Sequence, residues 1–143
     1  MSAEETADVV RRYYDLVNHL DDPGRFDIVA PDVVLREPGR LIEGREALRQ
    51  RMAAFPAAFA DLRLTIDDLV AGADKAAVRW TLTGTHRGAF GPYPPTGKPV
   101  TMTGIGIFRV ADGRVAEGWG CFDTLSVQLQ LGATLTPPAQ PVR

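Results

Sequence analysis

The stretch VTMTGIGIFRVADGRVAEGWGCFDTL, residues 100–125, decides the fold of this chain. Its two halves, residues 100–110 and 114–125, are rich in β-branched and aromatic side chains, which favour strands. Between them, Ala111-Asp112-Gly113 is typical of a hairpin turn. The stretch therefore predicts two antiparallel strands.

The segments before this hairpin extend the same pattern. Residues 62–69 and 76–85 predict two further strands, joined by a turn at residues 71–74. Residues 87–99 lie between the middle strands and hold three glycines, four prolines and a tyrosine. Because this composition is too rich in proline for a strand and too constrained for a flexible linker, we expect an ordered loop near the rim of the sheet.

Apolar residues at helical spacing dominate the first part of the chain. They recur from residue 6 to residue 20, and Asp21-Asp22-Pro23-Gly24 then stops the pattern. Leu48, Met52 and Phe55 predict a second long helix that Pro56 ends or kinks. The other elements expected here are a helical turn at residues 26–29 and a strand at residues 33–37.

Helices followed by an antiparallel meander are typical of a segregated α+β domain. We expect three N-terminal helices packed in a strongly curved antiparallel sheet. With 143 residues, 45% of them hydrophobic, the chain can bury one core and keep a concave pocket. The predicted domain spans residues 1–132, and residues 133–143, with three prolines and little to bury, are expected to form a flexible tail.

Charge and composition argue against several classes of partner. The net charge of −2 arises from 16 basic and 18 acidic residues mixed along the chain, so we expect no nucleic acid. No apolar run approaches the roughly 20 residues of a membrane span, and the N-terminal segment Met-Ser-Ala-Glu-Glu-Thr has no targeting pattern, so we expect no membrane and a cytoplasmic location. Cys121 is the single cysteine, and His19 and His86 lie far apart, so neither a disulfide nor a metal site is expected.

Strand periodicity assigns side chains to the two faces of the sheet. Val78, Trp80 and Leu82 form the apolar face of their strand, which places His86 inward as well. Glycine inside a strand needs a reason, and two remain open here: room for a ligand, or strong curvature of the sheet. On the next two strands, glycines share one face with large apolar residues, as Met102, Gly104, Gly106 and Phe108, then as Gly118, Gly120 and Phe122.

The opposite face carries isoleucines, threonines and Trp119. Such a face would be an exposed apolar surface unless another subunit covered it, so we expect a homodimer through the sheet. Trp119 and Cys121 are interpreted as interface residues, and Asp123 as a structural carboxylate near the sheet edge.

Several short motifs in this chain resemble those of one family. They are PDVV at residues 31–34, VRWTLTGTHRG at 78–88, PPTG at 94–97, DGRV at 112–115, EGW at 117–119 and QLG at 130–132. In order and spacing they are similar to the SnoaL-like polyketide cyclases of the NTF2-like superfamily, over roughly residues 5–132. The resemblance implies a cone of curved sheet and three helices, usually dimeric, and closure of a ring in aromatic polyketides by an aldol step without a cofactor.

Three positions depart from the catalytic pattern that this resemblance implies. Gly120 lies where the family cyclases carry their aspartate, and Gly106 where they carry a histidine. Leu35 corresponds to an asparagine of the aromatic cyclases. A pocket without these acid and base groups would suit a shape-driven ring closure, such as an intramolecular cycloaddition, in which positioning supplies the rate.

Two positions match the ketosteroid isomerase branch of the superfamily. Tyr13 corresponds to its hydrogen-bonding tyrosine and Glu37 to its proton-abstracting aspartate, and a carboxylate in an apolar cavity is a stronger base than one in water. The alternatives are a rim carboxylate paired to Arg36 or Arg40 for Glu37, and a core tyrosine with a satisfied hydroxyl for Tyr13. His86 either holds or protonates a substrate oxygen, or fixes the following loop by hydrogen bonds.

Three functional hypotheses follow. The leading one is a cofactor-independent cyclase that closes a carbon ring in a hydrophobic polyketide-type intermediate of antibiotic biosynthesis, with Glu37, His86 and Tyr13 as candidate catalytic residues. The second is a ketosteroid-isomerase-like or epoxide-opening enzyme that uses Glu37, and the third is a non-catalytic small-molecule binding module. The predicted substrate contacts are Leu35, Trp80, Met102, Gly104, Gly106, Gly118, Gly120 and Phe122.

Overall fold

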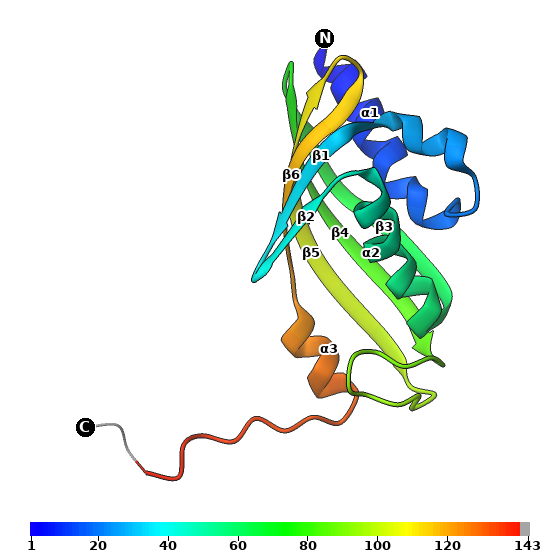
Figure 1. Ribbon diagram of the computed structural model, residues 1–143. Coiled ribbons are helices and arrows are strands. Elements are labelled where there is room, and N and C mark those ends of the chain that lie inside the picture. Colours follow the sequence, from blue (N-terminus) through cyan, green and yellow to red (C-terminus); the bar gives the residue numbers. More distant parts are fainter. Residues whose placement is uncertain (141–143) are drawn as a thin grey trace.

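The computed structural model, which describes residues 1–140, contains a curved sheet with two helices against one face (Figure 1). These helices are α1 (Ala3–Asp15) and α2 (Arg45–Ala58). The sheet has six strands in the order β2-β1-β6-β5-β4-β3, which confirms the α+β class. The strands are β1 (Val29–Glu37), β2 (Arg40–Glu43), β3 (Phe59–Ala71), β4 (Lys75–His86), β5 (Pro99–Ala111) and β6 (Arg114–Phe122).

The sheet is mixed, whereas the sequence predicted a wholly antiparallel one. β1 pairs with β6 in parallel, with Val34 opposite Glu117 and Arg36 opposite Trp119. The short strand β2, which the sequence pattern did not reveal, pairs with β1 across a turn at Gly39, whose φ of +70° favours glycine. Helix α2 then leads to β3 at the far edge, so the meander returns to β1 from the other side and meets it in parallel.

Local signals set the start of the first helix. The hydroxyl of Ser2 accepts a hydrogen bond from the Glu5 backbone N–H, and the Glu5 carboxylate accepts one from the Ser2 backbone. This capping box begins α1. The helix continues as the 3-10 helix η1 (Leu16–Asn18), and the turn expected near residue 26 is a second 3-10 helix, η2 (Pro23–Ile28).

Two helix boundaries differ from the sequence expectation. Helix α2 continues past Pro56 to Ala58, because a proline in the last turn removes only one backbone hydrogen bond. The last strand ends at Phe122 and does not reach Leu125, since Asp123 accepts a hydrogen bond from the Ser126 backbone N–H and begins helix α3 (Thr124–Gln130). The third α-helix is therefore C-terminal.

Alternation along β4 and β5 places the predicted side chains on the inner face. Val78, Trp80, Leu82 and His86 are each at most 7% exposed, whereas Ile105 on the opposite face is 57% exposed. The glycine-bearing face of β5 and β6 is the inner, helix-covered one. The predicted parity is thus confirmed on these strands.

Three of the four inner-face glycines of β5 and β6 accommodate aromatic rings. A β-carbon on Gly104 would lie 2.3 Å from a ring carbon of Trp80. A β-carbon on Gly106 or on Gly118 would lie 2.7 Å from the ring of Phe108. Real β-carbons do not approach other atoms this closely, so these glycines allow the two rings to lie against the sheet.

The segments after the strands are of two kinds. Residues 87–98 form a loop that is tied to the fold by backbone hydrogen bonds, since the Gly88 N–H donates to the Ala58 carbonyl at 3.0 Å and the Gly97 N–H to the His86 carbonyl at 2.8 Å. Residues 133–140 contain no helix or strand and lead away from the sheet (Figure 1). The last three residues of the predicted tail, 141–143, lie outside the described part of the chain. Within residues 1–140, none of the helices combines the length and apolar character that crossing a membrane requires.

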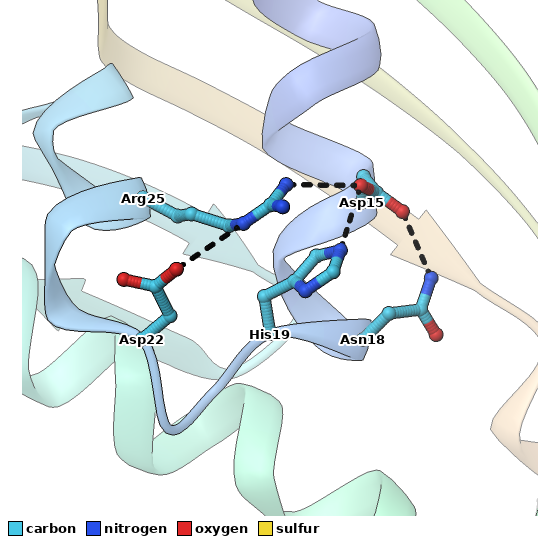
Figure 2. Close-up of polar contacts among 5 residues, drawn as sticks. All are labelled: Asp15, Asn18, His19, Asp22 and Arg25. Atoms are coloured by element: carbon cyan, nitrogen blue, oxygen red, sulfur yellow. Dashed lines mark hydrogen bonds and ion pairs between the residues drawn. The ribbon is translucent and has the colours of Figure 1, made fainter.

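A group of polar and charged side chains, the Asp15 cluster, lies where α1 ends (Figure 2). The Asp15 carboxylate accepts a hydrogen bond from the Asn18 side chain at 3.0 Å and lies 3.1 Å from Nε2 of His19. Arg25 of η2 lies 3.8 Å from Asp15 and 3.4 Å from Asp22. These exposed contacts connect the end of α1 to η2.

Candidate active site

A cavity of about 110 Å³ lies between the two long helices and the inner face of the sheet. Helices α1 and α2 and strands β1, β3, β4, β5 and β6 all contribute to its lining. Because most of the lining is apolar, the cavity suits a hydrophobic ligand. Its apolar walls include Leu35, Leu48, Met52, Trp80, Met102 and Phe108.

One ion pair lies in this apolar lining. Glu37 is the last residue of β1, and its Oε1 accepts a hydrogen bond from Nε of Arg51 on α2 at 2.9 Å. The side chains of Glu37 and Arg51 are only 11% and 16% exposed. The pairing with Arg36 or Arg40 that the sequence left open is not present in the structure, since Glu37 pairs with Arg51.

Aromatic rings hold the guanidinium of Arg51 in place. It lies 5.1 Å from the ring centre of Phe55 and 5.5 Å from that of Phe122, within the range of cation–π attraction. Only Nε donates to Glu37, and only to Oε1. The second carboxylate oxygen, Oε2, makes no hydrogen bond with the described residues and is free to meet a ligand.

Two tyrosines on α1, Tyr13 and Tyr14, also line the cavity. Burial raises the pKa of Tyr13 well above its ordinary value, and the neighbouring Tyr14 and the charge of Glu37 raise it further. Burial also raises the pKa of Tyr14. Both phenols are therefore neutral near pH 7 and able to donate a hydrogen bond to a ligand oxygen.

The side chain of Glu37 lies in the space in front of Gly120. Since Arg36 is opposite Trp119 in the parallel pair, the next residues, Glu37 and Gly120, are neighbours on the inner face. A β-carbon on Gly120 would meet only Cγ of Glu37, at an unstrained 3.9 Å. Glu37 thus extends over the position where the resemblance places an aspartate, and the carboxylate comes from β1 instead of β6.

The structure brings together seven of the residues selected from the sequence and leaves four outside the cavity. Those in the lining are Tyr13, Leu35, Glu37, Trp80, Met102, Gly120 and Phe122. Gly104, Gly106 and Gly118 are covered by aromatic rings, as described above, and His86 is absent from the lining.

His86 is fully buried beside the loop that follows it. The Thr96 backbone N–H donates to Nδ1 at 3.2 Å, and the Thr96 hydroxyl lies 2.9 Å from the same nitrogen. Because Nδ1 accepts a hydrogen bond, the proton of neutral His86 is on Nε2, which has no partner among the described residues. These contacts fit the alternative in which His86 fixes the loop.

Sequence reasoning did not identify Tyr14, Arg51 or Phe55 as parts of the site. Arg51 lies in a segment with several charged residues, a composition typical of a solvated helix face. One signal was available, because Arg51 is three residues after Leu48 and four before Phe55 and therefore shares their helix face. The described residues also include no group of three or more histidine, cysteine, aspartate or glutamate side chains placed to hold a metal ion.

Comparisons with known proteins give a consistent result. A family model described as SnoaL-like polyketide cyclase matches residues 7–131. No curated protein sequence matches the chain.

Solved structures of bacterial proteins are similar over most of the chain. TsrD from Streptomyces laurentii is 29% identical with a TM-score of 0.81, and the match covers 94% of this chain and 99% of that one. IdmH from Streptomyces antibioticus, provisionally described as a polyketide cyclase, is 31% identical with a TM-score of 0.78, covering 90% and 99%. AclR from Streptomyces galilaeus, provisionally described as a hydroxylase, is 28% identical with a TM-score of 0.75, covering 89% and 97%.

Proposed function

The chain belongs to the SnoaL-like polyketide cyclase family, and on this premise we propose that it is a cofactor-independent cyclase acting on a hydrophobic polyketide-type intermediate. Its fold is the NTF2-like α+β fold of a curved sheet with helices on its inner face. The observation that carries the proposal is the location of Glu37. This carboxylate reaches into an apolar cavity beside Gly120, with one oxygen free and two neutral tyrosines in the same lining.

The proposed reaction needs only groups already in the cavity. The free oxygen of Glu37 removes a proton from a carbon next to a substrate carbonyl, and the neutral hydroxyl of Tyr13 or Tyr14 stabilises the enolate oxygen by a hydrogen bond. The enolate carbon attacks a second carbonyl of the same chain, and the resulting alkoxide takes the proton back from Glu37. One carbon–carbon bond forms, no group leaves, and the product is an isomer of the substrate.

The apolar walls contribute to this proposal by positioning. Trp80, Met102 and Phe122 surround the space in front of Glu37, so that a flexible substrate would have to fold with its reacting carbons close together. Restricting a chain in this way lowers the entropic part of the barrier. A purely shape-driven cycloaddition would use the same walls and would not need Glu37.

An isomerase is the second candidate, favoured by the presence of Tyr13 and Glu37 in the lining of the same cavity. In that reaction Glu37 would remove a proton next to a carbonyl and return it to another carbon of the same dienol, while a tyrosine holds the oxygen. Since the first step is shared with the cyclase, the two functions differ in the substrate and not in the residues.

The proposal also includes a homodimer in the cytoplasm. Ile105, Ile107 and Trp119 leave an apolar area on the outer face of the sheet, with exposed fractions of 57%, 45% and 38%. Covering these side chains with a second copy would remove them from water. The exposed free thiol of Cys121 on the same face is compatible with a reducing compartment.

The function is tested by incubating the purified protein with extracts of linear polyketide intermediates and following products by chromatography and mass spectrometry. We expect a product of unchanged mass and altered retention without any added cofactor. Retention of a compound without conversion would instead indicate a binding protein and contradict the enzymatic proposal for that ligand class.

A further inference from the structure

We propose that the mouth of the cavity is an anion site, formed by Arg40 and Arg51, that binds the carboxylate of an apolar organic acid. The proposal rests on the function given above, because the apolar part of the same ligand would occupy the cavity. It adds a substrate class to that function, namely amphiphilic carboxylic acids.

Arg51 is shared by two hollows of the molecule. It lines the inner cavity and also an outer groove of about 360 Å³, here called the mouth groove. The mouth groove lies between α2, the 87–98 loop and α3, and its polar and aromatic lining consists of Arg40, Arg51, Phe90, Tyr93, Thr124 and Gln128. A ligand that extends from the cavity past Arg51 would therefore enter this groove.

The charge of the mouth groove is unbalanced. Both ionised residues in its lining are arginines, and no aspartate or glutamate lines it. Glu37 neutralises Arg51 from the cavity side, whereas Arg40 has no carboxylate within 4.0 Å among the described residues. Two guanidinium groups at one opening, one of them unpaired, favour an anion, and their planar geometry suits a carboxylate.

The size of the cavity indicates that Arg51 has to move when a ligand binds. At about 110 Å³ the cavity is smaller than the roughly 300 Å³ of an ordinary small-molecule pocket. Arg51 lines it together with Phe55 and Phe122, whose rings its guanidinium contacts. A ligand carboxylate in the mouth groove would attract this guanidinium outward and enlarge the space between the two rings.

This movement would couple binding to chemistry. As Arg51 turns to the ligand carboxylate, its hydrogen bond to Oε1 of Glu37 breaks. Glu37 then has no ion-pair partner, and both of its carboxylate oxygens are available to a substrate proton. An acid would thus both open the site and free its carboxylate, whereas a neutral analogue of the same length would do neither.

The test measures binding and does not depend on turnover. Decanoate and its neutral methyl ester are titrated into the full-length Trp119→Phe variant. In this variant Trp80, in the cavity wall, is the remaining tryptophan, and its fluorescence is followed. We expect decanoate to bind about tenfold more tightly than the ester, because only decanoate forms hydrogen bonds through a charged group. Equal affinities, or no binding of either probe, would overturn the proposal.

Two variants locate the effect. Arg40→Gln should remove most of the preference for decanoate over the ester. Arg114→Gln, which removes an exposed arginine at the start of β6, is the matched control and should keep the preference. A preference that survives Arg40→Gln would overturn the assignment.

A third probe tests the class of anion. Decyl phosphate has the same chain length as decanoate, and tighter binding of decyl phosphate would overturn the choice of a carboxylate. A protein that prefers decanoate but converts no polyketide would keep the anion site and lose the proposed function, so the two failures are distinguishable.

Discussion

The Glu37–Arg51 pair and the Asp15 cluster contain contacts of similar length in different surroundings. The cavity pair is 2.9 Å apart and the His19–Asp15 contact 3.1 Å. The side chains of the cavity pair are 11% and 16% exposed, whereas those of His19 and Asp15 are 33% and 50% exposed. Burial, and not distance, therefore gives an ion pair its energetic and chemical consequences.

The fold produces this difference through the elements that carry each group. Asp15 is the last residue of α1 (Figure 2), and its side chain is 50% exposed, so water competes for its charge. Glu37 ends β1 under helix α2, with aromatic rings around its partner Arg51. Removing one partner therefore leaves a solvated charge at the surface but a poorly solvated one in the cavity.

Removing one arginine from the cavity pair should change the free energy of unfolding far more than removing one from the Asp15 cluster. Arg51→Ala should lower the free energy of unfolding by about 2–4 kcal/mol, because it leaves Glu37 unpaired in the cavity. Arg25→Ala in the Asp15 cluster should change it by less than about 0.5 kcal/mol. Urea denaturation of both variants measures the free energy of unfolding. Equal losses would contradict the distinction between the buried pair and the exposed cluster.

Removing both charges of the cavity pair should restore most of the loss. We expect the free energy of unfolding of the double variant Glu37→Leu, Arg51→Met to lie within about 1 kcal/mol of that of the unmodified protein, because apolar side chains replace both charges. The corresponding double-mutant cycle should give a coupling energy of about 1–3 kcal/mol. A double variant as unstable as Arg51→Ala would mean that packing, and not charge, sets the loss.

The buried tyrosines of the cavity should make the stability of the protein depend on pH in the alkaline range. Because the pKa values of Tyr13 and Tyr14 are raised in the folded protein, the folded state keeps their protons to higher pH than the unfolded chain does. Their contribution to stability is thus complete below about pH 10 and is lost as pH rises further. Urea midpoints between about pH 8 and pH 11.5 should fall less steeply in a Tyr13→Phe, Tyr14→Phe variant than in a Tyr93→Phe control.

The smallest effect is expected from salt at the Asp15 cluster. His19→Ala should change the free energy of unfolding by at most about 0.5 kcal/mol in dilute buffer and by nothing measurable in 1 M NaCl. The coupling of Glu37 and Arg51 should persist in the same salt, because water and ions are largely excluded from the cavity. A salt-insensitive cost above about 1 kcal/mol for His19→Ala would contradict the distinction.

Much of the fold could be predicted because it depends on local patterns. Strand alternation alone placed Trp80, Met102 and Phe122 on the inner face, where they line the cavity. The parallel contact of β1 with β6 could not be predicted in this way, since it depends on how the whole meander returns across the sheet. Glu37 and Gly120 are adjacent because of that parallel contact, so their adjacency could not be predicted from the strand pattern either.

The site was harder to predict than the fold because side-chain partners are not periodic. Arg36 and Arg40 are close to Glu37 in sequence, but Arg36 pairs with Glu117 across the outer face of the sheet. Arg51 reaches Glu37 only because α2 crosses over the end of β1. Likewise, three inner-face glycines give space to neighbouring rings, which a strand pattern does not distinguish from space for a ligand.

We propose that Glu37 acts as the acid and base of the cavity. The turnover number of Glu37→Gln tests this role, for a substrate converted by the unmodified protein, with Asp15→Asn as the matched change of a surface carboxylate. We predict a loss of about 100-fold or more for Glu37→Gln and an unchanged rate for Asp15→Asn. A folded Glu37→Gln variant with full turnover would contradict the claim and indicate ring closure driven by the shape of the cavity alone.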